Sequence, residues 1–173
     1  MFFMDLESEI LKEHSKQHSV KIANWIGADA KRFAQLMQLF LSAEYRVVQR
    51  SAWIVSLCAE KHPSLIQPWL SKMVRRAGEK DVHDAVRRNV VRVLQFVEIP
   101  RKLQGPVVNL CFNFLQSIAA PVAVKVFSMT VLANIARFEP DLKHEVKLAV
   151  EQMLPYGSAG FRSRGTKILN LLA

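Results

Sequence analysis

A repeat of about 38 residues constrains the fold of this chain more than any other feature of its sequence. Four segments align when Val48, Val86, Val124 and Phe161 are taken as their first positions, at spacings of 38, 38 and 37 residues. Further apolar or small residues follow at offsets of four, seven, eight and eleven. The residues at offset four are small or slim: Ala52, Val90, Ser128 and Gly165. These offsets trace one face of an α-helix, so the repeat predicts four similar helices with one buried stripe each.

Proline-led turns separate these segments from the helices that follow them. The pairs His62-Pro63, Ile99-Pro100 and Glu139-Pro140 each place a proline where a new helix can begin, because the first helical residue needs no backbone N–H. We expect partner helices over roughly 29–41, 63–77, 101–117 and 140–154, after a shorter pair over roughly 4–14 and 18–26. Two partner helices contain an internal proline, Pro68 or Pro106, which predicts a kink in each.

The whole chain, residues 1–173, is predicted to form one all-α domain. No Ser/Gly-rich or Pro-rich stretch separates two compositional regions, and no Asn-Gly or Asp-Gly hairpin turn occurs. The domain is expected to contain a degenerate N-terminal cap repeat over about 1–28 and repeats over about 29–62, 63–99, 100–139 and 140–173. An irregular helical bundle is the alternative arrangement of the same helices.

The second helices of these repeats resemble those of the HEAT-repeat family. The segments Val48-Gln49-Arg50-Ser51-Ala52, Val86-Arg87-Arg88-Asn89-Val90 and Val124-Lys125-Val126-Phe127-Ser128 follow the family's order of an aliphatic, a basic and a small residue. The resemblance covers nearly the whole chain. It implies a right-handed α–α superhelix, a HEAT-like solenoid, of about five helix pairs. In such stacks the second helices line a concave face, which usually carries the binding.

Basic residues are concentrated where this concave face is expected. Residues 1–30 have a net charge of −2 and the rest of the chain has a net charge of +11, which gives +9 for the whole chain. Offsets one, two, five and six of the four segments hold no acidic residue. They provide the predicted ligand-binding groove: Arg50, Trp53, Arg87, Arg88, Arg92, Lys125, Arg162 and Lys167. Arginine and lysine would attract phosphate or carboxylate groups there, and Trp53 would stack on a base or pack against a partner's side chain.

The competing interpretation of these cations is a solvated basic face, with Trp53 closing the join between two repeats. Two further cations, Arg101 and Lys102, begin a helix, where the helix dipole disfavours positive charge, and this mildly favours a partner at that position.

We expect a non-enzymatic binding scaffold whose groove accepts an acidic protein segment, and a nucleic-acid-binding module is the alternative. The chain also has a distant likeness to HEAT-like DNA alkylation-repair proteins, the alkylpurine DNA glycosylases, whose basic concave groove handles damaged DNA. The likeness rests on Arg50, Trp53, Arg87, Arg88 and Lys125. The chain is shorter than that family and has no carboxylate at the concave positions. No catalytic residue is therefore assigned, and glycosylase activity is the least favoured hypothesis.

The sequence predicts no metal site and no cofactor site. No phosphate-cradling glycine loop, HExxH or GxSxG motif occurs, so no cofactor is expected. His14 and His18 are four residues apart, but Ser15–Ser19 reads as a turn and no further ligand converges, so no metal site is predicted.

The expected setting of the chain is the cytoplasm. Cys58 and Cys111 lie in apolar helical segments without ligand spacing, which is typical of buried, reduced thiols. No apolar run approaches the roughly 18 residues that span a bilayer, and the first residues lack the basic region of a signal peptide. The apolar tail over 168–173 is expected either to fold onto its neighbour or to pair with a second copy in a homodimer.

Overall fold

The computed structural model describes residues 5–42 and 44–173, and all regular secondary structure within these ranges is helical. The all-α fold class is therefore confirmed. The chain forms two compact units, residues 1–93 and 94–173. The prediction of a single folding domain stays a prediction.

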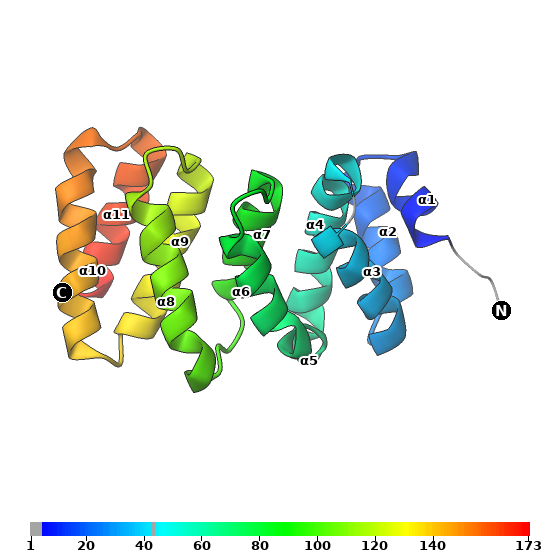
Figure 1. The fold of residues 1–173 in the computed structure, drawn as a ribbon, viewed down its shortest axis with the longest axis horizontal. Coiled ribbons are helices and arrows are strands. Elements are labelled where there is room, and N and C mark those ends of the chain that lie inside the picture. Colours follow the sequence, from blue (N-terminus) through cyan, green and yellow to red (C-terminus); the bar gives the residue numbers. More distant parts are fainter. Residues whose placement is uncertain (1–4, 43) are drawn as a thin grey trace. The chain divides into compact units, whose positions relative to one another are not determined.

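Helix α4 lies at the centre of the N-terminal unit and packs against α1, α2, α3 and α5 (Figure 1). The helices of this unit are α1 (Leu6–Lys12), α2 (Lys16–Ile26), α3 (Ala30–Ser42), α4 (Tyr45–Lys61), α5 (Pro63–Ile66), the 3-10 turn η1 (Gln67–Trp69), α6 (Leu70–Gly78) and α7 (Asp84–Leu94). Helix α7 thus ends on the first residue of the second unit. Ser15 begins α2 as a cap, since its hydroxyl oxygen accepts a hydrogen bond from the backbone N–H of His18 at 3.1 Å.

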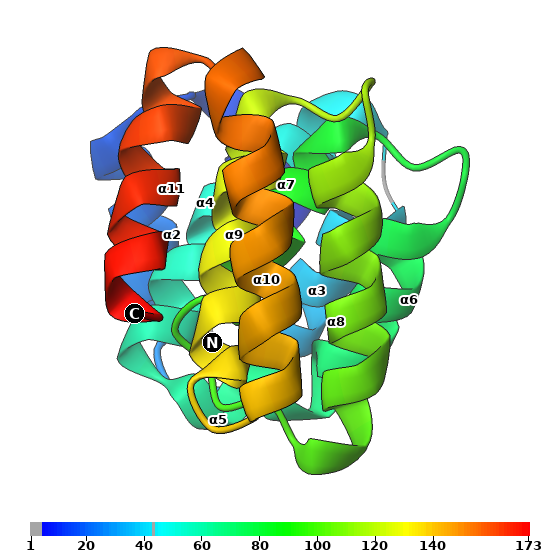
Figure 2. The ribbon, with the colours of Figure 1, turned by 90° about the vertical axis from the view of Figure 1, so that its left-hand side faces the viewer.

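The C-terminal unit consists of two layers. Helices α8 and α10 form one layer and α9 and α11 the other (Figures 1 and 2), and α9 packs against the three other helices. The helices are α8 (Arg101–Gln116), α9 (Val122–Ala136), α10 (Pro140–Met153), the 3-10 turn η2 (Leu154–Tyr156) and α11 (Ala159–Leu171). The turns at 117–121 and 154–158 lie at one end of these layers.

The buried stripe predicted from the repeat is confirmed. The first positions, Val48, Val86, Val124 and Phe161, are at most 4% exposed. At the four later offsets every residue is buried except Leu169, which is half-buried. Gly165 shows why offset four needs a small residue, because a Cβ atom there would lie 3.2 Å from Cγ1 of Val150 on α10. The sequence period therefore reports a real packing requirement.

Three residues assigned to the ligand-facing side are instead buried. Ile54, Val91 and Met129 are at most 2% exposed, although their offsets of five or six placed them away from the core. A middle helix of a stack contacts its partner helix as well as neighbouring repeats, so its apolar face is wider than one stripe. The assumption of one polar side per helix was wrong at these positions.

The two internal prolines behave differently. Pro68 lies in η1, where the expected helix over 63–77 is divided into α5 and α6. Pro106 lies inside α8, which continues from Arg101 to Gln116 without interruption. Proline removes one hydrogen bond in either case, but only the first interrupts the helix. The two repeats therefore differ at this point, and the kink expected at Pro106 stays a prediction.

Candidate functional site

A hollow of about 160 Å³ lies between α4 and α7 in the N-terminal unit, and it brings three of the predicted groove residues together. Its lining contains Trp53 from α4 and Arg88 and Arg92 from α7. The rest of the lining is His14, Gln49, Ala52 and Asn89. Two helices and the turn after α1 therefore supply one small, polar and cationic hollow.

The repeat itself fixes the direction of these side chains. On α7, Val86, Val90 and Val93 face the core, which leaves Arg88 exposed and Arg92 half-buried on another side of the helix. Residues four apart on a helix are neighbours, so Arg88 and Arg92 lie on the same side of α7 and both line the hollow. A guanidinium can hold a carboxylate or phosphate in two places, while the adjacent indole of Trp53 offers a flat apolar surface.

Arg50, which was assigned to the same groove, instead serves the packing of α1. Its Nη1 atom donates a hydrogen bond to the backbone oxygen of Leu11 at 2.6 Å. Leu11 is near the end of α1, where carbonyl groups have no partner within the helix. Arg50 therefore closes the C-terminal end of α1, and its role in ligand binding stays a prediction.

Arg87 is likewise engaged in structure. It forms an ion pair with Asp84, with 3.1 Å between Nη1 and Oδ1, and Nη2 donates to the backbone oxygens of Glu79 and Lys80, both at 3.0 Å. Its side chain is only 25% exposed, and its buried Nε atom has no hydrogen-bond partner within the described residues. Arg87 holds the connection between α6 and α7 and is not part of the lining, whereas its neighbour Arg88 lines the hollow.

The predicted cations of the C-terminal unit lie on α9 and α11. Lys125 lines a second hollow at the start of α9, whereas Arg162 and Lys167 are exposed on α11. The Nη1 atom of Arg162 donates to the backbone oxygen of Gly157 at 2.6 Å. Arg164, which the repeat alignment did not single out, donates from Nη1 to the hydroxyl oxygen of Thr130 at 2.6 Å and so links α11 to α9.

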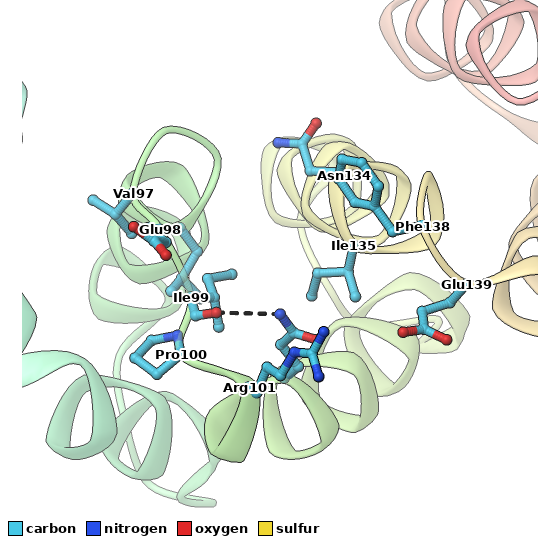
Figure 3. A pocket seen from close by; sticks show the side chains of 11 residues that line it. Val97, Glu98, Ile99, Pro100, Arg101, Asn134, Ile135, Phe138 and Glu139 are labelled. Atoms are coloured by element: carbon cyan, nitrogen blue, oxygen red, sulfur yellow. Dashed lines mark hydrogen bonds between the residues drawn. The ribbon is translucent and has the colours of Figure 1, made fainter.

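A further hollow, which sequence reasoning missed, opens at the other end of the C-terminal unit (Figure 3). It measures about 420 Å³ and lies between the segment before α8 and the C-terminal end of α9. Figure 3 shows Glu98 and Glu139 on opposite sides of it, with Arg101 between them and the ring of Phe138 at the rim. Its lining contains both apolar and polar side chains, and the sequence pointed to this place through Arg101 at the start of α8.

Hydrogen bonds from two side chains to backbone oxygens keep the hollow of Figure 3 in shape. The amide of Gln104 donates to the backbone oxygen of Ile99 at 3.2 Å, the dashed line in Figure 3. The amide of Asn134 donates to the backbone oxygen of Gln95 at 2.9 Å. The two bonds attach the segment 95–100 to α8 and α9. Because carboxylates and a guanidinium line the hollow together, its charge is mixed.

The two cysteines, Cys58 and Cys111, are buried thiols. Burial raises the pKa of the Cys58 and Cys111 thiols to about 12, so both are protonated near neutral pH. The Nε2 atom of His18 lies 2.8 Å from the backbone oxygen of Glu9, whereas His14 lines the Trp53 hollow. Within residues 5–42 and 44–173, no three potential ligands are grouped to hold a metal ion.

Comparison with known proteins supports one assignment. The family model for the HEAT repeat domain matches residues 6–172. No curated protein and no solved structure matches the chain. Among the described residues, no helix is both long and apolar enough to span a bilayer.

Proposed function

Because this chain belongs to the HEAT repeat family, whose members are generally non-enzymatic helical scaffolds that commonly mediate protein interactions, we propose that it binds an acidic segment of a partner protein. The observation that carries the proposal is the hollow of Trp53, Arg88 and Arg92. The exposed guanidinium of Arg88 can donate two hydrogen bonds to a carboxylate there, and the indole of Trp53 can cover an adjoining apolar group.

The arrangement of the other cations favours a protein ligand over a nucleic acid. A phosphate backbone is bound by many cations along one track, since each contact releases counterions. In the N-terminal unit, Arg50 and Arg87 are instead bound to backbone oxygens of their own unit. The remaining hollow of about 160 Å³ suits one or two acidic side chains better than an extended chain of phosphates.

Two other hypotheses have less support. Glycosylase activity would need a carboxylate at the groove, and the lining of the Trp53 hollow contains none. The homodimer remains a prediction, but Ile168 and Leu172 are at most 3% exposed within the chain itself, so they need no second copy for their burial. Light scattering over a range of concentrations tests the homodimer directly.

Binding of a fluorescent glutamate-rich peptide tests the proposed function. We expect the peptide to bind at low salt and Arg88→Glu to weaken it roughly tenfold or more, since a charge-assisted contact becomes repulsive. Lys31→Glu is the matched control, because Lys31 is exposed at the start of α3, where a carboxylate suits the helix dipole.

Each outcome of this experiment is decisive. Equal affinity of the Arg88→Glu and Lys31→Glu variants, or no binding of the peptide at low salt, contradicts the proposal. A generic DNA duplex is measured in parallel. If the duplex binds with a steep dependence on salt while the peptide does not, the nucleic-acid alternative replaces the proposal.

A further inference from the structure

An apolar hollow lies between the start of α9 and the turn that joins α10 to α11. It measures about 260 Å³, and its apolar lining is Val122, Met153, Tyr156 and Phe161. Tyr156 is 91% exposed and Val122 47% exposed, whereas Phe161 is 3% exposed and forms the floor. Lys125 and Gln152 supply polar groups at its edge. The hollow therefore combines an apolar interior with a cation.

The floor of this hollow is fixed by local packing. The hydroxyl oxygen of Ser158 accepts a hydrogen bond from the backbone N–H of Phe161 at 3.3 Å and so caps α11. A Cβ atom on Gly157 would lie 2.5 Å from Cδ1 of the Phe161 ring, so only glycine permits this approach. Arg162 also donates to the oxygen of Gly157. The position of the Phe161 floor is thus fixed by the fold itself.

Exposed apolar side chains gather at this end of the C-terminal unit. Ile118, in the turn before α9, is 101% exposed, and its turn lies at the same end of the unit as the turn that contains Tyr156 (Figure 2). Isolated exposed apolar residues are ordinary, but a group of them beside a preformed hollow marks an interaction surface. A partner that covered Val122 and Tyr156 would remove apolar area from water.

Charge identifies the kind of partner. Lys125 is the one charged residue in the described lining, and Arg162 donates to the backbone oxygen of Gly157, which also lines the hollow. The one acidic residue next to a lining residue in the sequence is Glu151, which precedes Gln152. A cationic partner would be repelled, whereas carboxylates beside an apolar side chain would be attracted.

We propose that this hollow holds one aromatic or large aliphatic side chain of an acidic protein segment. The inference deepens the proposed function, on which it rests, because it names the apolar residue that anchors such a segment. It depends on residues of α9, α10 and α11 that take no part in the Trp53 hollow. The two proposals can therefore fail separately.

The probe is a synthetic peptide with one phenylalanine flanked by glutamates, compared with the same peptide carrying alanine in place of phenylalanine. Affinity is measured by fluorescence anisotropy. We expect the alanine peptide to bind roughly tenfold more weakly, as for the loss of one anchoring aromatic residue. Methyl NMR signals of Met153 and Val122 are expected to shift with the phenylalanine peptide only.

Variants of the exposed wall residues test the location without disturbing the core. Tyr156→Ala and Val122→Ser are expected to reduce affinity for the phenylalanine peptide to that of the alanine peptide. Phe138→Ala is the matched control, since Phe138 is 82% exposed on the same unit but lines the opening in Figure 3. Circular dichroism confirms that each variant is folded.

The outcomes separate this inference from the proposed function. If both peptides bind equally, or if Tyr156→Ala and Phe138→Ala have equal effects, the anchoring hollow is refuted, while sensitivity to Arg88→Glu would leave the proposed function standing. If neither peptide binds, both proposals fail. If single-stranded DNA shifts the Met153 and Val122 signals and the peptide does not, a nucleobase replaces the protein side chain as the occupant.

Discussion

The two units engage their cations in different ways, although the repeat aligns Arg87 with Lys125 and Arg162. In the N-terminal unit, arginines donate to backbone oxygens: Arg50 to that of Leu11 and Arg76 to that of Leu41. Arg87 donates to the backbone oxygens of both Glu79 and Lys80. In the C-terminal unit, Arg162 likewise donates to the backbone oxygen of Gly157, whereas Lys125 lines a hollow and Lys167 is exposed. Equivalent positions in a repeat therefore need not have equivalent roles.

The difference follows from what surrounds each cation. The ends of α1 and α3 and the connection between α6 and α7 bring backbone oxygens within reach of α4, α6 and α7. In the C-terminal unit, close packing of small residues joins the helices, as at Gly165 against Val150. We expect the N-terminal unit to be sensitive to loss of arginine and the C-terminal unit to be sensitive to added volume.

The largest expected effect is that of Gly165→Leu. A larger side chain there would meet Val150 at once and separate α11 from α10, which is expected to cost about 3 kcal/mol. Urea unfolding measures this loss, and thiol labelling shows where it occurs, since Cys111 belongs to the C-terminal unit and Cys58 to the other. Gly160→Ala is the control, because its Cβ atom would meet nothing within 4 Å. Equal labelling of both cysteines in Gly165→Leu would show that the units do not open separately.

Arg87→Ala is expected to have the next largest effect. It removes the ion pair with Asp84 and both bonds to the α6–α7 connection, at a cost of about 1.5 kcal/mol. Labelling of Cys58 should rise more than that of Cys111. Arg88→Ala, one residue away and exposed, is expected to change stability by less than about 0.5 kcal/mol. If Arg88→Ala proves the more destabilising of the two, the assignment of structural and binding roles is reversed.

Arg50→Ala should act more locally. Loss of its bond to Leu11 leaves the end of α1 uncapped, and we expect about 0.5 kcal/mol, confined to that helix. Hydrogen exchange of the α1 amides is the measurement. Arg46→Ala, one turn earlier on α4 and exposed, provides the comparison. Unchanged exchange in α1 would mean that Arg50 is available for a ligand after all.

The smallest expected effect is a loss of α1 stability at low pH. A hydrogen bond from Lys12, helped by the nearby charge of Lys21, lowers the pKa of Glu9 below its ordinary value of 4.5. A carboxyl group whose pKa is lowered in the folded state stabilises the protein at pH values above its unfolded-state pKa. This stabilisation is lost as the pH falls through the folded-state pKa. We expect α1 amide protection to be constant at neutral pH and to decline below about pH 4.5. Glu9→Gln should remove this decline, and its persistence in that variant would point to another group.

The repeat period predicted the fold well because burial leaves a regular trace in the sequence. Helix bounds near 30–42, 101–116 and 140–153 were expected to within about two residues, as cap and proline signals allow. The sequence did not reveal that Pro68 interrupts a helix whereas Pro106 does not. That outcome depends on the surrounding packing rather than on the residue itself.

The candidate sites were predictable only in part. The alignment identified Trp53, Arg88 and Arg92, which share one hollow, because residues four apart lie on one helix face. It could not separate Arg88 from Arg87, since their roles depend on a connection between helices that has no periodicity. It also missed Val122 and Tyr156, because exposure of an apolar side chain in a turn leaves no sequence pattern.

The bonds made by Arg162 and Arg164 have a consequence for the thermodynamics of association. A long arginine side chain normally loses about 2 kcal/mol of rotamer entropy when a ligand immobilises it. Each of these guanidinium groups already donates one arm, to Gly157 or to Thr130, and retains other N–H groups on its planar fork. Much of the ordering is completed when the chain folds, so an incoming carboxylate meets donors that are already oriented.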